Sequence, residues 1–192
     1  MDRFRLKLKL DGTVLTVREP NPADLRENAA TFAAWYSDER NSRMMGGRRM
    51  TSDEAFESFE EATVAGNRVF FLEVNGKLAG DADFRRIEPP TCEFAIMIGS
   101  HETQGKGFGT AFCWMLHHLA FHHLGFETIY LTIVPQNSAG LRCYTKVGYA
   151  VDAGPAAARY KEAKTEIAMS VTHAMFERVQ SGWLSRIEIE RY

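Results

Sequence analysis

Residues 104–125 read Q-G-K-G-F-G-T-A-F-C-W-M-L-H-H-L-A-F-H-H-L-G. Three glycines stand between positions 105 and 109, and apolar residues then recur at spacings of three and four, namely Phe108, Ala111, Phe112, Met115, Leu116 and Leu119. This spacing predicts a helix with one buried face, which Gly125 ends in a left-handed conformation. Just upstream, Phe94, Ile96 and Ile98 alternate as in a strand. The segment therefore predicts a strand, a glycine loop and a helix.

A glycine loop at the start of a helix is suited to binding a diphosphate. The first N–H groups of a helix have no partner within it, the helix dipole adds positive potential there, and glycine leaves room for an anion to approach. The loop lacks the Lys-Ser/Thr ending of a Walker loop. It also fails the dinucleotide pattern, because Thr110 stands where the third glycine is needed.

The loop does fit the pattern Q/R-x-x-G-x-G/A, through Gln104, Gly107 and Gly109. In this motif the chain resembles the GNAT superfamily, the acetyl-coenzyme-A-dependent N-acetyltransferases. Its overall layout is most similar to the branch that holds the ribosomal-protein N-terminal and spermidine acetyltransferases. The resemblance implies one GNAT domain over residues 1–192, with a core at about 13–171 and a C-terminal helical extension over 173–192.

The order of elements expected from periodicity and turn signals agrees with that resemblance. Helices interrupt a strand-rich chain without strict alternation, which favours an α/β (α+β) fold with a mixed sheet. The resemblance implies a mostly antiparallel, seven-stranded central sheet with helices on both faces. Strands are expected at 13–19, 69–74, 77–86, 92–98, 128–134, 149–153 and 166–171, and helices at 24–36, 52–66, 108–124 and 137–146.

Composition excludes several classes of protein. The chain has 192 residues and a net charge of −2, from 23 basic and 25 acidic residues, which argues against nucleic-acid binding driven by overall charge. It has no apolar run of membrane-spanning length and no signal-peptide core at its start, so we expect no membrane partner. Its three widely spaced cysteines fit a cytoplasmic location.

Two residues of the segment N-S-A-G-L-R-C-Y-T-K-V-G-Y are candidates by resemblance. Asn137 is expected to contact the pantetheine arm, and the Tyr144 hydroxyl to protonate the departing coenzyme A thiolate. A leaving thiolate is stabilised by such a positioned O–H group. The alternative is that Asn137 only caps a helix and Tyr144 only packs.

Glu93 is the candidate base. It lies at the start of the strand before the glycine loop, on the face opposite to Phe94. An amine must lose its proton to attack a thioester, and several GNAT subfamilies are similar in placing a Glu here. The alternative is an exposed carboxylate paired with Arg85 or Arg86. Asp81 and Asp83, on the neighbouring strand, are substitute candidates.

The co-substrate implied by the resemblance is acetyl-coenzyme A. The backbone of 96–98 is expected to pair with the pantetheine amides, and the N–H groups of 104–110 to hold the diphosphate; Lys106 assists a phosphate or is merely solvated. The expected cofactor-binding residues are Ile96, Met97, Ile98, Gln104, Gly105, Lys106, Gly107, Phe108, Gly109, Thr110, Asn137 and Tyr144.

Two further clusters have more than one interpretation. His118 and His122 stand at i and i+4, a spacing that can chelate a metal, but the sequence points to no third ligand, so no metal is expected. Arginines at 40, 43, 48 and 49 lie where this family builds its acceptor pocket. They suggest an anionic acceptor or are ordinary charges of an exposed loop.

The predicted function is transfer of acetyl from acetyl-coenzyme A to a primary amine of a small molecule or of a peptide or protein N-terminus, by direct attack. The alternatives are transfer of a different acyl group, or a coenzyme-A-binding sensor or partner module without turnover. The apolar residues near the C-terminus, such as Leu184 and Ile187, need a cover, which suggests a homodimer.

Overall fold

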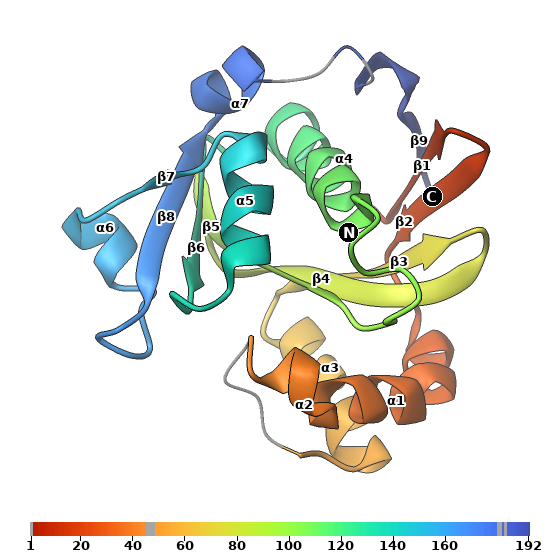
Figure 1. Ribbon diagram of the computed structural model, residues 1–192. Coiled ribbons are helices and arrows are strands. Elements are labelled where there is room, and N and C mark those ends of the chain that lie inside the picture. The colour runs from red at the N-terminus through yellow and green to blue at the C-terminus, as the bar shows by residue number, and fades with distance from the viewer. Residues whose placement is uncertain (1, 45–48, 180–181, 183) are drawn as a thin grey trace.

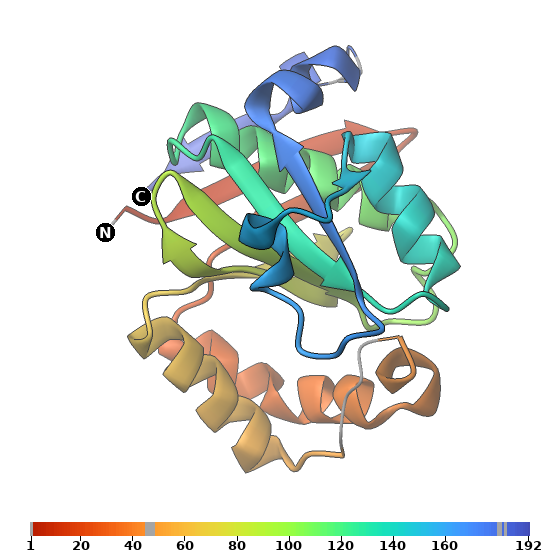
Figure 2. The same ribbon diagram turned by 90° about the vertical axis from the view of Figure 1, so that its left-hand side faces the viewer.

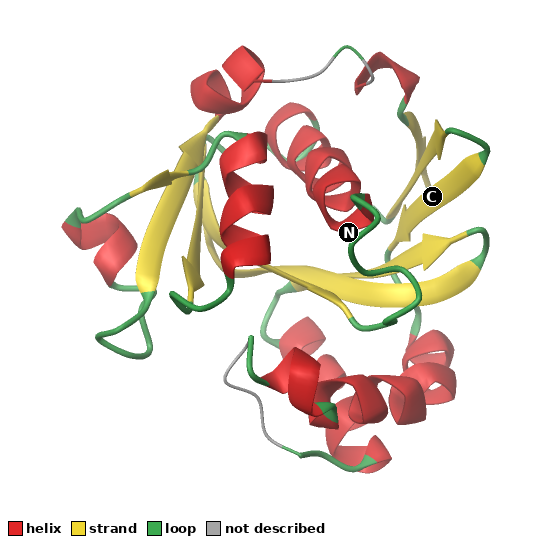
Figure 3. Ribbon diagram, in the orientation of Figure 1, coloured by secondary structure: helices red, strands yellow, loops and turns green. Residues whose placement is uncertain are grey.

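The computed structural model describes residues 2–44, 49–179, 182 and 184–192. Within them one nine-stranded sheet runs in the order β7-β8-β6-β5-β4-β3-β2-β1-β9. Its strands are β1 (Phe4–Leu10), β2 (Thr13–Arg18), β3 (Arg68–Val74), β4 (Lys77–Glu88), β5 (Thr91–Ile98), β6 (Thr128–Ile133), β7 (Ala150–Val151), β8 (Ile167–Thr172) and β9 (Glu188–Arg191). Only the β5–β6 pair is parallel among the described strands. The expected mixed, mostly antiparallel sheet is confirmed (Figure 3).

Helices cover both faces of the sheet, as expected (Figures 1 and 2). They are α1 (Pro22–Ser37), α2 (Glu39–Ser42), α3 (Ser52–Val64), α4 (Phe108–His122), α5 (Ser138–Val147), α6 (Pro155–Ala158) and α7 (His173–Val179), with a 3-10 turn at Leu184–Arg186. The fully buried Phe112 and Leu116 of α4 pack with Phe84 and Phe94 on one face, and Phe32 of α1 packs with Phe59 and Phe71 on the other. No helix of the described part is both long and apolar enough to cross a membrane.

The sheet has two strands more than the seven expected, and both lie near the chain ends. β1 was not predicted, although Phe4, Leu6 and Leu8 alternate with charged residues and are buried. β9 pairs with β1, so the helical extension expected over 173–192 is wrong beyond α7. The reason is that the sequence of β9 carries little local signal for a strand. An edge strand such as β9 forms where a neighbouring strand, here β1, has backbone N–H and C=O groups available for pairing. As a result the two termini lie side by side (Figure 1).

The boundaries of the first helix also differ from expectation. The helix begins at Pro22 rather than at residue 24, and Asn21 is its N-cap, because the Asn21 side chain accepts from the Asp24 N–H while the Asp24 carboxylate accepts from the Asn21 N–H. This reciprocal pair is a capping box, and Pro22 at the first helical position suits it. Asp24 is therefore the third helical residue.

The feature that positions the site is the separation of β5 from β6. The two strands are in register only from the Thr91–Thr128 pair to the Glu93–Tyr130 pair. Beyond Glu93, β5 keeps its partner β4 but is not paired with β6 in the described sheet. The edge of β5 from Phe94 to Ile98 therefore offers backbone groups to the gap, and α4 and α5 flank this gap (Figure 1).

Candidate active site

A cleft of about 800 Å³ opens where β5 and β6 separate. Its wall includes most of the residues expected to bind the cofactor, namely Ile96, Met97, Ile98, Gln104, Gly105, Gly107, Gly109, Thr110, Asn137 and Tyr144. Lys106 and Phe108 do not line it: Lys106 is exposed, and Phe108 packs against the main core. Segments far apart in the sequence thus meet at one cavity.

The glycine loop leaves the N-terminus of α4 open to an anion. Gly105 and Gly107 have φ angles of 74° and 82°, in the left-handed region that favours glycine. Gly107 is the N-cap and offers no side-chain acceptor, and the first helical bond is donated by Ala111. The N–H groups of 108–110 therefore have no partner within the helix, at the positive end of its dipole.

The charges around the cleft are of one sign. Among its described lining residues, Arg40, Arg43, Arg142 and Lys146 are basic, His101 is titratable, and none is Asp or Glu. Arg43 is paired with Glu39 on its own helix. A cleft of this kind is suited to a ligand with several phosphates. Two of the four arginines predicted to face the acceptor thus lie on the cleft; Arg49 is exposed, and Arg48 is outside the described residues.

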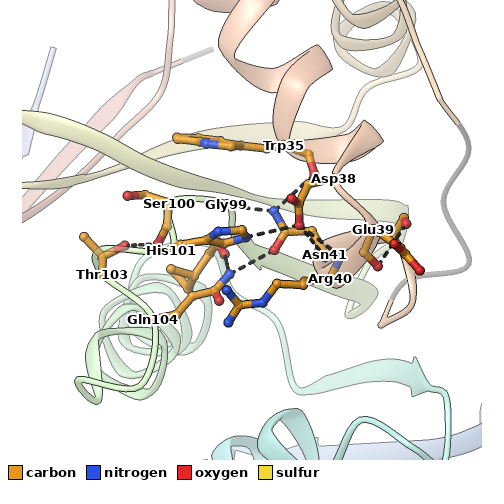
Figure 4. Close-up of polar contacts among 12 residues, drawn as sticks. Trp35, Asp38, Glu39, Arg40, Asn41, Gly99, Ser100, His101, Thr103 and Gln104 are labelled. Carbon is orange, nitrogen blue, oxygen red and sulfur yellow. Dashed lines mark hydrogen bonds and ion pairs between the residues drawn. The ribbon is translucent and has the colours of Figure 1, made fainter.

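A polar junction that the sequence did not reveal joins α2 to the glycine loop (Figure 4). The buried Asn41 amide donates to the carbonyls of Trp35 and Gly99, at 3.1 and 3.2 Å. Its oxygen accepts from the Gln104 amide, which also donates to the Ile98 carbonyl, at 2.9 and 2.7 Å. The Gln104 side chain thus ties the start of the glycine loop to α2 and to the end of β5.

The same junction depends on a close approach of backbone and ring. A Cβ on Gly99 would lie 2.2 Å from the Trp35 ring, so only glycine fits there. Asp38 caps α2 through the N–H groups of residues 40 and 41 and also contacts His101 Nε2 at 3.1 Å. A hydrogen bond from the Asn41 backbone is the first cause that lowers the pKa of the Asp38 carboxyl. The corner between α1 and α2 is therefore held against the glycine loop.

Tyr144 lies on α5 with its side chain almost wholly buried and its edge on the cleft. Burial raises its pKa well above the ordinary value, so the phenol keeps its proton at neutral pH. Asn137 caps α5 by accepting from the Gly140 N–H at 2.9 Å, and its amide contacts the Met44 carbonyl at 3.4 Å. Asn137 therefore both caps the helix and lines the cleft.

A buried hydrogen bond between His117 and Tyr149 lies next to Tyr144. His117 is fully buried, and burial lowers its pKa to about 4. Its Nδ1 lies 2.7 Å from the Cys113 carbonyl, so the neutral ring carries its proton there. The Nε2 atom then accepts from the Tyr149 hydroxyl at 2.7 Å. The Tyr149 ring, rather than its hydroxyl, contacts the ring of the candidate acid Tyr144.

Glu93 does not line the cleft. It lies on the face opposite to Phe94, as predicted, but it is buried rather than exposed, with 1% of its side chain accessible. Its carboxylate pairs with Arg85 at 3.1 Å and with Arg86 at 2.8 Å. Burial raises its pKa and the two guanidinium groups lower it. The pairing that sequence reasoning considered as the alternative is therefore present.

A second buried carboxylate lies closer to the cleft. Asp81 of β4 stands directly opposite Met97, a cleft residue, and accepts from the Tyr36 hydroxyl at 2.8 Å. Its Oδ1 atom has no hydrogen-bond partner among the described residues. Burial raises the pKa of Asp81 to about 7, and it raises the pKa of the neighbouring Asp83 to about 6. Asp81, Asp83 and Glu93 therefore share the sheet face on which α1 lies.

This combination of fold and cleft is that of an acyl-coenzyme-A N-acyltransferase, and comparison with known proteins gives the family. The model of the acetyltransferase (GNAT) domain matches residues 15–150. The chain therefore belongs to the GNAT family and is an acetyl-coenzyme-A-dependent N-acetyltransferase by class. A search of curated proteins found no match.

Solved structures share the fold at low sequence identity. The aminoglycoside acetyltransferase AAC(6')-Ib in complex with coenzyme A has a TM-score of 0.70 and 19% identity, over 87% of this chain and 99% of that one. Spermidine N-acetyltransferase from Vibrio cholerae, with coenzyme A and spermine, has a TM-score of 0.69 and 21% identity, over 85% and 98%. Mycobacterium smegmatis RimJ, with CoA-disulfide, has a TM-score of 0.74 and 17% identity, over 96% of each.

Proposed function

We propose that this protein transfers the acetyl group of acetyl-coenzyme A to the primary amine of a small molecule or of a peptide N-terminus. The observation that carries the proposal is the meeting of three features in one cleft: the unpaired edge of β5, the open N-terminus of α4 and the Tyr144 hydroxyl. Family membership supports it independently. The acetyl donor supplies a thioester, whose carbonyl carbon accepts the amine.

The residues of the cleft fit the parts of that donor. The N–H groups at the start of α4 receive the diphosphate, and Arg142 and Lys146 add positive charge beside it. The backbone groups of β5 from Ile96 to Ile98 form strand-like hydrogen bonds with the pantetheine amides. An N–H on the same edge polarises the thioester carbonyl. These contacts hold the reacting carbon beside Met97.

Two proton transfers complete the reaction. The attacking amine forms a C–N bond and loses a proton, the C–S bond breaks, and the sulfur gains a proton. Tyr144 donates to the departing sulfur, since it keeps its proton and faces the cleft. The amine proton goes to a carboxylate, directly or through water. Geometry favours Asp81 over Glu93 for this role, because Asp81 is opposite Met97 and is not in an ion pair with an arginine.

The same carboxylates support a cationic acceptor. Glu93 pairs with both nearby guanidinium groups, at 3.1 and 2.8 Å, whereas Asp83 lies 4.0 Å from Arg85. Among the described side chains, the Tyr36 hydroxyl is the hydrogen-bond partner of Asp81. An ammonium group of the acceptor would supply the missing partner. The arginine cluster suggested an anionic acceptor, but Arg40 and Arg43 lie on the basic cleft that we assign to coenzyme A. The buried carboxylates therefore favour a cationic acceptor instead. The similar structures crystallised with kanamycin and with spermine also hold amines.

A panel of amines tests the proposal. Purified protein would be incubated with acetyl-coenzyme A and polyamines, aminoglycosides, amino acids or peptides, and the released thiol measured. We expect turnover with at least one acceptor that carries a second positive charge. Turnover only with anionic amines would overturn the assigned acceptor class. Tight binding of acetyl-coenzyme A without turnover on any amine would favour a non-catalytic sensor.

A further inference from the structure

Three potential metal ligands meet at the end of α4 that is remote from the cleft. They are His122, in the last turn of α4, and His173 and Glu177, which stand at i and i+4 on α7. One ligand atom from each lies within 4.8 Å of the other two. The sequence shows only the His118 and His122 pair on α4 and points to no third ligand. The fold supplies two more from a helix about 50 residues later.

The distances suit a transition-metal ion. Glu177 Oε1 lies 3.0 Å from His122 Nε2 and 3.5 Å from His173 Nε2. Metal–ligand bonds of about 2.0–2.1 Å in a tetrahedron place neighbouring ligand atoms about 3.3 Å apart. Two of the three edges therefore need almost no adjustment, and the third, between the two imidazole nitrogens, lies within 4.8 Å.

The site is also oriented in advance and open on one side. The His173 ring stacks on Phe121 at 5.1 Å with an interplanar angle of 2°, which fixes the direction of its nitrogen. The His173 Nε2 atom is buried and has no hydrogen-bond partner among the described residues, apart from the 3.5 Å approach of Glu177. All three side chains are partly exposed, so an ion can enter from solvent and keep a water as fourth ligand.

We propose that His122, His173 and Glu177 form a binding site for a divalent transition metal, with Zn²⁺ as the best match to two imidazoles and one carboxylate. The ion joins the end of α4 to α7. Since α4 has 15 residues, about 22 Å of helix separates the ion from the glycine loop. The metal therefore stabilises the fold and takes no part in acetyl transfer.

Calorimetric titration of Zn²⁺ into the metal-free full chain, prepared without a polyhistidine tag, tests the proposal. We expect one equivalent to bind, and at a hundredfold excess over the dissociation constant the midpoint of thermal unfolding to rise by about 5 °C or more. His173→Ala and Glu177→Gln should each weaken binding at least about tenfold. His123→Ala, which changes a neighbouring histidine outside the ligand set, should bind as the wild type does.

Two results would overturn the site. One is the absence of a one-equivalent binding event in the wild-type protein. The other is equal affinity in the wild type, His173→Ala and Glu177→Gln, which would place any bound zinc elsewhere, for example at Cys143 in the cleft. Circular dichroism of each variant separates loss of a ligand from loss of the fold. These readouts do not involve acetyl transfer, so they stand or fall independently of the proposed function.

Discussion

The two sides of β5 differ in charge and in how their polar groups are satisfied. On the α4 side, the cleft has basic side chains, no described acidic lining residue and a helix N-terminus with free N–H groups. On the α1 side, Asp81, Asp83 and Glu93 are buried in a row, and burial raises the pKa of each. We propose that a polyanion binds on the first side and an ammonium group on the second, so that the reacting carbon is held between them.

The largest expected effect comes from removing the proton donor of the cleft. Tyr144→Phe should lower kcat by about 10²–10⁴-fold, because the departing sulfur loses its acid, while the dissociation constant for coenzyme A changes little. Thiol-release kinetics and calorimetry measure the two quantities. A variant with unchanged kcat would exclude Tyr144 as the acid.

Tyr149→Phe is the matched control for that change. It removes a hydroxyl that binds the buried His117 and does not line the cleft. Leaving the imidazole nitrogen unpaired should lower the free energy of unfolding by about 1–3 kcal/mol. We expect its kcat to stay within a few fold of the wild type, so the comparison isolates the chemical role of Tyr144.

Asp81→Asn should have the next largest effect on kcat, and it should also change how the rate depends on pH. As a base Asp81 must be ionised, so the wild-type rate should rise with pH through its pKa of about 7. The variant should lose about 10²-fold in kcat and also lose this limb of the profile. Glu93→Gln provides the comparison: if it removes the limb and Asp81→Asn keeps it, Glu93 is the base.

The same variant should lose activity but gain stability at high pH. The folded-state pKa of Asp81 lies above the ordinary carboxyl value of 3.8. Between pH 3.8 and about 7 the folded protein therefore holds a proton that the unfolded chain has lost, so its stability decreases as pH rises over this range and levels off above it. Asp81→Asn removes this cost and should raise the free energy of unfolding at pH 8 by on the order of 1–4 kcal/mol. Denaturant unfolding at pH 5 and pH 8 measures the difference.

Gly107→Ala tests the open helix terminus with a smaller effect. Its added Cβ would meet nothing within 4 Å, so the cost is the backbone strain at a φ of 82°, about 1–2 kcal/mol. We expect the dissociation constant of coenzyme A to rise about 3- to 10-fold as the N–H groups shift. Gly12→Ala, with a φ of 79° and open space in the β1–β2 turn, carries the same strain and should not change that constant.

Arg142→Ala should have the smallest effect. An exposed charge on the cleft wall contributes little in water, so we expect a loss of about threefold in coenzyme A affinity that shrinks as salt is added. Arg178→Ala, an exposed arginine outside the described lining of the cleft, is the control. Equal losses in the two variants would remove Arg142 from the cofactor site.

Local patterns predicted the elements that depend on neighbours in sequence. The helical period after Gly107 and the neighbouring strands expected at 69–74 and 77–86 are of this kind, and they are present as α4, β3 and β4. β1 and β9 were missed, because their pairing joins the two ends of the chain. The resemblance to the GNAT family also predicted that the glycine loop and Tyr144 would bind the same cofactor, because the family shares one order of elements. Both line one cleft.

The environments of single polar residues could not be predicted in the same way. Asn41 and Gln104 are 63 residues apart, and no spacing rule connects them. Glu93 is buried against Arg85 and Arg86, beside a register shift of β4 between Arg85 and Glu88 that no sequence pattern reveals. Two of the three ligands of the proposed metal site come from α7, whose position beside α4 is a property of the folded chain. Such long-range contacts decide which of several chemically reasonable residues meet.

The most direct measurement is kcat/KM for two acceptors that differ only at the far end: 1,4-diaminobutane and 4-aminobutanoate. Both present the same primary amine on a chain of similar length, one with a second ammonium group and the other with a carboxylate. The opposite charges on the two sides of β5 predict a preference for the diamine of at least about tenfold. A preference for the carboxylate-bearing amine would contradict the assignment of the acidic side to the acceptor.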